Sequence, residues 1–264
     1  MPTQQEITKS LALITETFKA FRAELMDAYG VIEHVSKGDN SPVTELDVKI
    51  ETELKEKLLA EFPDFGFKGE ETDEVPSKSG ATWLVDPIDS TGSFIRGLPY
   101  CSNMAALVFD GEVIASVIYH FTDDELFTAQ KGHGAYKNGK RLHVRDTVLS
   151  DACVFADAGA YIHAYKFYAP HKVRFYAPVG ATGYFFTRLA QSSIQGVAYL
   201  TARIKPHDVA PGLLIAQEAG AHAVSLDNTP LSYTSTRLFA GTETLCSLTS
   251  SHRQEMIAAF KDIA

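Results

Sequence analysis

The chain has 264 residues and 45% of them are hydrophobic, which is enough for a substantial core in one large domain or in two lobes that share an interface. Its 24 basic and 33 acidic side chains leave a formal charge of −9, which disfavours general binding to nucleic acid. No stretch approaches the ~20 apolar residues that span a bilayer, and the N-terminus lacks a basic segment followed by an apolar one, so we expect a cytoplasmic protein that does not bind membranes.

The N-terminal part of the chain has the pattern of two amphipathic helices. Apolar side chains recur at intervals of three and four residues over 7–25, and Gly30 is a plausible stop. The same spacing returns over 46–58 and ends near Pro63. Thr44 and Asp47 have the spacing of a capping box at the start of this second helix, which predicts that the Asp47 carboxylate accepts a hydrogen bond from the Thr44 amide.

The middle of the chain has the pattern of strands. Short apolar runs separated by turns occur at 65–67, 83–85, 104–109, 113–119 and 126–129. The dipeptides Asp110-Gly111 and Asn138-Gly139 are strong hairpin signals, so part of the sheet should be antiparallel. Further on, 183–190 and 209–219 have helical patterns, with Gly220 as the stop of the second. This order of elements predicts layers of helix and sheet.

The most informative segment is 83–91, where two carboxylates stand three residues apart beside a hydroxyl-rich turn. Pro87 should end the regular strand, which places Asp86 at the strand's end. Two hard oxygen ligands on a short turn suit Mg²⁺, and the backbone amides of Ser90 and Thr91 could face an anion if a helix starts there. Turn formation and helix capping by Asp89 remain an equally good interpretation of this segment alone.

Other polar residues are also ambiguous when taken singly. Glu70, in the triplet 69–71, could be solvated loop charge, and Asp208 could simply cap the helix that follows it. The three cysteines, at 101, 153 and 246, are an odd number without paired metal-type spacing, so buried free thiols are expected rather than a disulfide framework or a zinc site.

Taken together and in this order, the motifs resemble the Mg²⁺-dependent, lithium-sensitive inositol monophosphatase-like family of sugar phosphatases. The resemblance covers nearly the whole chain, and Asp-Pro-Ile-Asp is its most specific part. The matching segments are residues 43–47, 69–71, 83–94, 97–99, 132–140 and 205–212, followed by 218–220.

The resemblance implies an α-β-α-β-α fold over residues 1–264, with possible lobes at 1–145 and 146–264, usually built as a homodimer. It also implies two to three Mg²⁺ ions. Glu70, Asp86 and the Ile88 carbonyl would bind one, Asp86, Asp89 and Asp208 a second, and Glu70 with water a looser third. Such ions lower the pKa of bound water and offset the charge of a phosphate monoester.

The family resemblance also implies catalytic and substrate roles. Asp47 and Thr91 match the pair that positions and activates the attacking water, with Glu70 as a further catalytic residue. The residues expected to bind phosphate or substrate are Ser90, Thr91, Ala181, Thr182 and Thr201.

Several positions depart from the family pattern. Ser90 stands where glycine is usual; if this position needs a positive φ or a close backbone approach to phosphate, Ser90 should strain or narrow the site, with Gly92 restoring flexibility. His207 replaces a common tryptophan and is expected to pack as an aromatic substitute, while Pro211 should fall in the first turn of its helix. Thr201 replaces a glutamate that often bonds inositol hydroxyls, and Arg203 could favour a substrate with a second anionic group.

The leading hypothesis is therefore a Mg²⁺-dependent phosphatase of a small phosphorylated metabolite, with inositol monophosphate as the family default. Fructose 1,6-bisphosphate and histidinol phosphate are alternative substrates, because relatives on this scaffold use them. The alternative from another class is a binding or regulatory protein that keeps the fold without catalysis. The retained carboxylates disfavour it, because crowded like charges destabilise a fold that does not use them.

Overall fold

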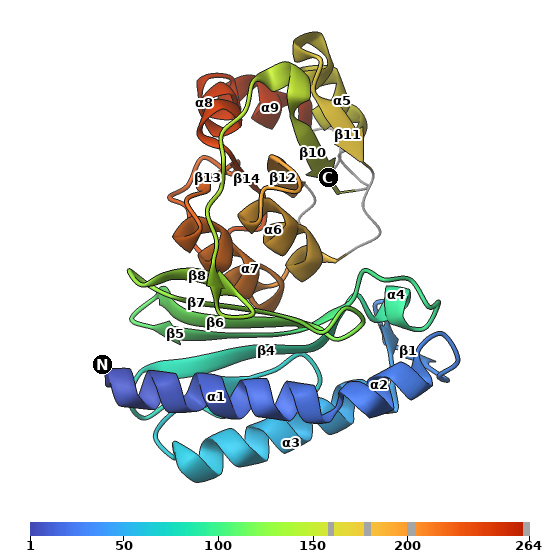
Figure 1. Cartoon of the computed structure of the whole chain (residues 1–264), viewed down its shortest axis with the longest axis vertical. Helices are drawn as coiled ribbons and strands as arrows, with labels where there is room; N and C mark the ends of the chain where they lie inside the picture. Colours follow the sequence, from blue (N-terminus) through green and yellow to red (C-terminus); the bar gives the residue numbers. More distant parts are fainter. Residues whose placement is uncertain (158–160, 177–180, 200–203, 261–264) are drawn as a thin grey trace.

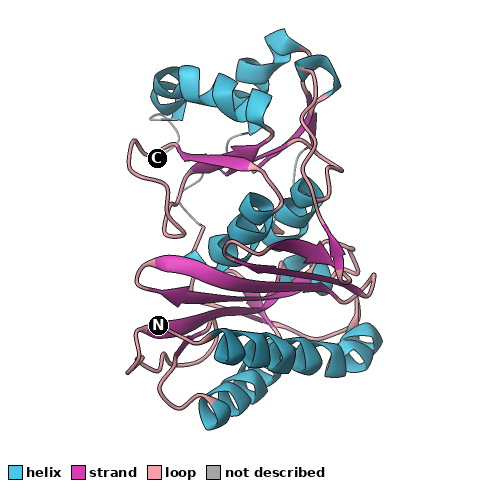
Figure 2. Ribbon diagram, turned by 60° about the vertical axis from the view of Figure 1, so that its left-hand side comes forward, coloured by secondary structure: helices cyan, strands magenta, loops and turns pink. Residues whose placement is uncertain are grey.

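The computed structural model describes residues 1–157, 161–176, 181–199 and 204–260. Helical layers alternate with two sheets, and the middle helices lie between the sheets (Figures 1 and 2). This arrangement confirms the predicted α-β-α-β-α architecture. Within the described residues, no helix is both long and apolar enough to cross a membrane.

The first helical layer consists of α1 (Gln4–Ala20), α2 (Arg22–Ala28) and α3 (Glu45–Glu61). The single helix predicted over 7–25 is instead two helices that meet at Phe21, which keeps a right-handed conformation with φ −78° and so preserves the general direction of the chain. Ile14 and Phe18 of α1 are fully buried beneath the first sheet. The predicted helix over 46–58 is confirmed as α3.

The first sheet has the strand order β3-β4-β5-β6-β7-β8-β9. Its strands are β3 (Gly66–Lys68), β4 (Ala81–Asp89), β5 (Ser102–Phe109), β6 (Glu112–His120), β7 (Glu125–Gln130), β8 (Gly134–Lys137) and β9 (Lys140–Arg141). Only the β3–β4 pair of this sheet is parallel. The hairpin turns predicted at 110–111 and 138–139 are confirmed, with positive φ at all four residues.

Strand β4 extends further than the sequence predicted. It runs through Pro87 to Asp89, but its register against β5 shifts between Asp86 and Asp89. Proline lacks the N–H that a regular ladder needs, so the ladder is interrupted at this residue. The Pro87 carbonyl accepts a hydrogen bond from the Asn103 side chain at 2.6 Å. The irregularity lets the chain stay in the sheet while it presents both carboxylates near the strand's end.

The middle layer contains α6 (Thr182–Ala190) and α7 (Pro206–Glu218). Helix α7 begins earlier than the predicted 209, so Pro211 lies inside the helix and not in its first turn. Ser116 of β6 donates to the Pro211 carbonyl at 2.7 Å, which ties this part of α7 to the first sheet. Gly220 follows the helix with a φ of 100°, as expected for its stop.

The second sheet has the order β11-β10-β12-β14-β13. Its strands are β10 (Cys153–Ala156), β11 (Arg174–Tyr176), β12 (Gly196–Tyr199), β13 (His222–Ser225) and β14 (Leu238–Gly241). The outer helices α5 (Tyr161–Tyr168), α8 (Glu243–Ser251) and α9 (Arg253–Phe260) cover it (Figure 1). The division into lobes at 145/146 stays a prediction. All three cysteines are free, and Cys153 is only partly buried.

Three short elements lie near the site. Strands β1 (Val35–Ser36) and β2 (Pro42–Val43) form an antiparallel pair just before α3. Helix α4 (Thr91–Phe94) follows β4 directly, so the predicted helical turn after Ser90 is confirmed.

Candidate active site

Asp47 is held in place at both of its carboxylate oxygens. Oδ2 accepts hydrogen bonds from the Thr44 amide at 2.8 Å and the Thr44 hydroxyl at 2.6 Å, which confirms the predicted capping box. Oδ1 lies 3.0 Å from the hydroxyl of Thr91, 44 residues further along the chain. The same hydroxyl is 3.0 Å from the Ile88 carbonyl. Asp47 therefore caps its helix and contacts the β4 turn as well.

Asp86 and Asp89 are buried at the end of β4, with exposed fractions of 2% and 5%. Asp89 is fixed by α6: Gly183 donates its amide to Oδ2 at 2.8 Å, and Thr182 donates its amide to Oδ1 at 3.2 Å. Asp86 Oδ1 has no hydrogen-bond partner among the described residues although it is buried. A buried acceptor without a donor is costly unless a ligand satisfies it.

Ser90 adopts the left-handed conformation that glycine would allow without strain. Its φ and ψ are 63° and 54°, so the positive φ considered for this position is present. Gly92 lies within α4 and does not take over that conformation. Instead, the Ser90 hydroxyl lies 2.8 Å from the Ser93 hydroxyl, across the start of the helix. The side chain thus helps hold the turn in the conformation that its backbone disfavours.

Glu70 is surrounded by cations. Its Oε1 accepts from Lys205 at 2.8 Å and from Lys37 at 3.2 Å, and the Glu70 side chain is 18% exposed. Burial raises the pKa of Glu70, but the hydrogen bond from Lys205 and the charge of Lys37 outweigh it and hold the pKa below its usual value. Glu70 is therefore ionised at neutral pH and faces the rest of the site.

A residue that the sequence patterns did not single out, Glu51, positions the Glu70 loop. Its carboxylate is fully buried and accepts from the amides of Glu70 at 2.9 Å, Glu71 at 3.0 Å and Thr72 at 2.7 Å. A Cβ on Gly69 would overlap this carboxylate, so the glycine is needed for the close approach. Glu51 lies one helical turn after Asp47 on the buried face of α3. A charged residue on the face that the helical spacing predicts to be buried is the sequence signal that could have identified it.

Asp208 is the third residue of α7, and Lys205, not Asp208, is the cap residue. The alternative role left open by the sequence is therefore partly supported: Asp208 is not the cap residue, but its Oδ2 accepts from the amide of the cap residue Lys205 at 2.7 Å. Its neighbour His207 is buried, and the ring atom Nε2 lies 3.7 Å from Asp208 Oδ1 and 3.9 Å from Glu70 Oε2. Burial lowers the pKa of His207 to about 4, so its ring is neutral at pH 7.

The carboxylates are close enough to oppose one another's ionisation. Burial, together with the charges of Glu70, Asp89 and Asp208, raises the pKa of Asp86 well above its ordinary value. Burial and Asp208 raise the pKa of Asp89 to about 7, while the amides of α6 oppose the shift. Burial raises the pKa of Asp208 to about 6 and that of Asp47 by a smaller amount. The site therefore has an electrostatic need for a cation.

The donor set fits a hard divalent cation. It offers oxygen atoms, burial and neighbouring carboxylates raise the pKa values of three aspartates, and one buried acceptor, Asp86 Oδ1, lacks a donor. As the side chains stand, however, the described residues form no ready-made ligand group for an ion, since Glu70, Asp89 and Asp208 are turned toward donors of the protein. Binding would require these carboxylates to rotate away from those donors.

The predicted substrate residues are only partly placed by the structure. Ala181 is buried and precedes α6, while the Thr182 hydroxyl lies 3.3 Å from Asp89 Oδ1. Thr201 and Arg203 lie outside the described residues. Thr91 is buried at the start of α4, and Ser90 is half-buried.

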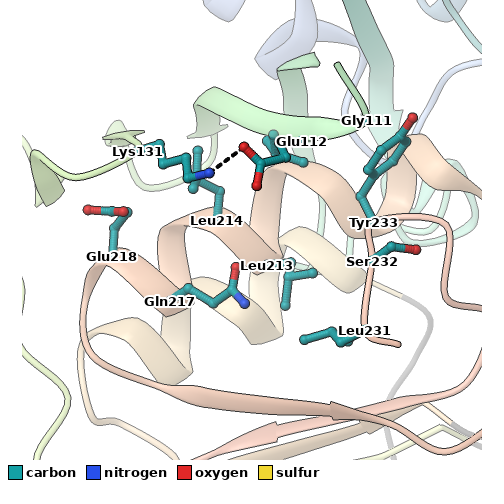
Figure 3. Close-up of a pocket in the computed structure, with 11 residues that line it drawn as sticks. Gly111, Glu112, Lys131, Leu213, Leu214, Gln217, Glu218, Leu231, Ser232 and Tyr233 are labelled. Atoms are coloured by element: carbon teal, nitrogen blue, oxygen red, sulfur yellow. Dashed lines mark hydrogen bonds and ion pairs between the residues drawn. The ribbon is translucent and has the colours of Figure 1, made fainter. Parts of the chain in front are cut away.

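A separate pocket lies away from these carboxylates. It has a volume of about 300 Å³ and is lined by the middle and end of α7, the β5–β6 hairpin and the segment 231–233. Figure 3 shows the ion pair between Lys131 and Glu112 on one side of it and Tyr233 on another. None of the predicted site residues lines this pocket, so it is not the candidate active site.

The fold and the site define a layered α/β protein with buried carboxylates where α3, β4, α6 and α7 meet. Residues 3–263 match the model of the inositol monophosphatase family. The chain belongs to this family. The resemblance inferred from the motifs is thereby confirmed.

Individual relatives carry several names. A histidinol-phosphatase from Chlorobaculum parvum is 39% identical over 140 residues, 52% of this chain and 54% of that protein, so the chain spans about half of that relative's length. A fructose-1,6-bisphosphatase/inositol-1-monophosphatase from Thermotoga maritima is 31% identical over 216 residues, 74% of this chain and 77% of that protein. The solved structure of extragenic suppressor protein suhB from Bartonella henselae matches with a TM-score of 0.81 and 25% identity, covering 96% of this chain and 98% of that one.

Replacement of Glu51 should loosen the Glu70 loop. In Glu51→Gln, an amide group would face backbone N–H donors, so we expect the free energy of unfolding to fall by about 2 kcal/mol. Urea denaturation measures this loss, and hydrogen exchange at the amides of residues 70–72 should become faster. The matched control is Glu56→Gln, an exposed position on the same helix. Equal stability of the two variants would contradict the positioning role.

Asp86 should destabilise the metal-free protein increasingly as pH rises. Its raised pKa means that the folded protein keeps a proton that the unfolded chain releases above about pH 4, so ionisation favours unfolding. Asparagine has no such charge. We expect metal-free Asp86→Asn to be more stable than the wild type, and by more at pH 8 than at pH 5, in urea denaturation with a chelator. A pH-independent difference, or one as large in the exposed control Asp151→Asn, would refute this account.

Proposed function

We propose that the protein is a Mg²⁺-dependent hydrolase of a small phosphate monoester. The observation that carries the proposal is the pair of buried carboxylates at the end of β4, whose pKa values are raised by burial and by neighbouring carboxylates and which include an acceptor without a donor. Family membership supports the same reaction class. Glu70, Asp86, Asp89, Asp208 and the Ile88 carbonyl would hold the two or three ions that the family resemblance implies.

The proposed chemistry needs no side-chain nucleophile. Bound Mg²⁺ would lower the pKa of water and offset the charge of the phosphate. The Thr91 hydroxyl can give its single proton to Asp47, 3.0 Å away, and accept a hydrogen bond from the attacking water. Asp47 would then be the general base that receives the water's proton through Thr91. Its capping bonds from Thr44 keep it oriented for this role.

The phosphate would lie against the start of α4. Its oxygens would accept hydrogen bonds from the backbone amides of Ser90 and Thr91, where the left-handed turn opens the short helix. Thr182 supports this arrangement indirectly, because it holds Asp89 in place. The protein would act as a homodimer, as the family resemblance implies, and in the cytoplasm, as expected from the hydropathy of the sequence.

A second anionic group on the substrate is favoured by the cations beside Glu70. Lys37 comes from the β1–β2 hairpin and Lys205 from the start of α7, and the Lys205 side chain is 46% exposed. When a divalent ion binds Glu70, these ammonium groups can turn toward the substrate. This makes fructose 1,6-bisphosphate a candidate substrate alongside inositol monophosphate and histidinol phosphate.

A purely regulatory protein would have little use for this site. Four carboxylates that oppose one another's ionisation lower stability unless a cation relieves them. Their retention, together with the Asp47–Thr91 contact, favours catalysis over a binding role alone.

Variants of the site separate metal binding from turnover. Phosphate release should be tested with Mg²⁺ on inositol 1-phosphate, fructose 1,6-bisphosphate and histidinol phosphate. We expect Asp47→Asn to lower kcat by about 10²–10⁴-fold while Mg²⁺ still binds, because only the general base is removed. Asp89→Asn should lose both Mg²⁺ binding and turnover. The exposed variant Asp151→Asn is the control, and the absence of Mg²⁺-dependent release from any substrate, or full activity in Asp89→Asn, would refute the proposal.

Lys205 should favour substrates with two phosphates. In Lys205→Met, we expect the ratio of kcat/KM for fructose 1,6-bisphosphate to kcat/KM for inositol 1-phosphate to fall about tenfold, the effect of ~1.4 kcal/mol from one charge-assisted contact. Steady-state kinetics on both substrates measure the ratio. The exposed Lys140→Met serves as the control. An unchanged ratio in Lys205→Met would show that the lysine only neutralises Glu70.

A further inference from the structure

His207 has a buried nitrogen without a partner. The residue is 6% exposed, and Nε2 has no hydrogen-bond partner among the described residues. Packing alone, the role expected from the sequence, does not account for this atom, because buried polar atoms normally have partners. A ring that only filled space could be wholly apolar.

The nitrogen faces two carboxylate oxygens for which the described residues provide no hydrogen-bond donor. Glu70 uses Oε1 for its two lysine contacts, and its Oε2 lies 3.9 Å from His207 Nε2. Asp208 uses Oδ2 for the Lys205 amide, and its Oδ1 lies 3.7 Å from the same nitrogen. In both residues, therefore, one oxygen is held by the protein while the other faces the imidazole.

These separations are short enough for small side-chain rotations to bring the nitrogen and the two oxygens around one ion, although the described residues form no ready-made ligand group. Two atoms that each lie about 2.1 Å from a metal can be at most ~4.2 Å apart, and both measured separations fall below that limit. They exceed an ordinary hydrogen bond, so direct bonding between the ring and the carboxylates does not explain the arrangement.

We propose that His207 Nε2 is a further ligand for a divalent cation, which it binds together with Glu70 Oε2 and Asp208 Oδ1. This inference rests on the proposed metal-dependent function and deepens it. An imidazole nitrogen among carboxylates favours first-row transition ions over Mg²⁺, which prefers oxygen ligands. One position of this site therefore selects an ion such as Mn²⁺.

Mn²⁺ is the probe that tests the inference directly. Pulsed electron paramagnetic resonance of Mn²⁺ bound to the wild-type protein should show coupling to a nitrogen nucleus. The coupling should change in the manner expected for ¹⁵N when the histidines are labelled with that isotope, and it should disappear in His207→Trp, which keeps an aromatic ring. His207→Gln is a second variant in case the first does not fold, and the exposed His222→Gln is the control.

The second readout is the metal preference. Calorimetric titration should show that the affinity ratio of Mn²⁺ to Mg²⁺ falls about tenfold or more in both His207 variants and stays unchanged in His222→Gln. Absence of nitrogen coupling in the wild type, or coupling and preference retained in the variants, would overturn the role of His207 while leaving the proposed function intact. If the wild type binds neither Mn²⁺ nor Mg²⁺ and releases no phosphate, the role of His207 and the proposed function are both refuted.

Discussion

The arrangement of this protein depends on the repulsion between carboxylates that the fold brings together. Glu70, Asp86, Asp89 and Asp208 come from three separate parts of the chain, and burial together with the charges of neighbouring carboxylates raises the pKa values of the three aspartates. The fold offsets this repulsion unevenly. Amides of α6 support Asp89 and two lysines support Glu70, whereas Asp86 lacks a donor at one oxygen. The least compensated carboxylate is thus the most deeply enclosed one, which is where a cation would relieve the greatest repulsion.

Helix α3 connects the two sides of the site. Asp47 and Glu51 lie one turn apart on its buried face, so one contacts the β4 turn through Thr91 while the other holds the loop of Glu70. A rigid helix therefore sets the distance between the proposed base and a proposed metal ligand. Neither side chain could be placed on a loop with the same constancy, because loop backbones move more than packed helices. The two buried acidic residues of α3 therefore help to position the other residues of the site.

The sequence predicted the features that depend on local chemistry. Helical spacing located α3, hairpin dipeptides located the turns, and the positive φ considered at Ser90 is present. Features that depend on distant contacts could not be predicted in this way. Pro87 does not end β4: the register against β5 shifts around it, and Asn103 from the neighbouring strand donates to its carbonyl. Glu51 appears in the sequence as one more charge on a helix, and its three amide partners lie about twenty residues away.

The position of α7 explains why residues at its start matter for the site as a whole. Its middle is tied to the first sheet through the Pro211 carbonyl and Ser116, and its Gly212 allows Phe186 of α6 to approach closely. Because proline has no N–H, Pro211 leaves the His207 carbonyl without its usual helical donor. The proposed adjustment of Asp208 and His207 to an ion would take place at their side chains, while the anchored middle keeps the helix between the sheets. This combination suits a site whose carboxylates must turn away from internal donors before they can act as ligands.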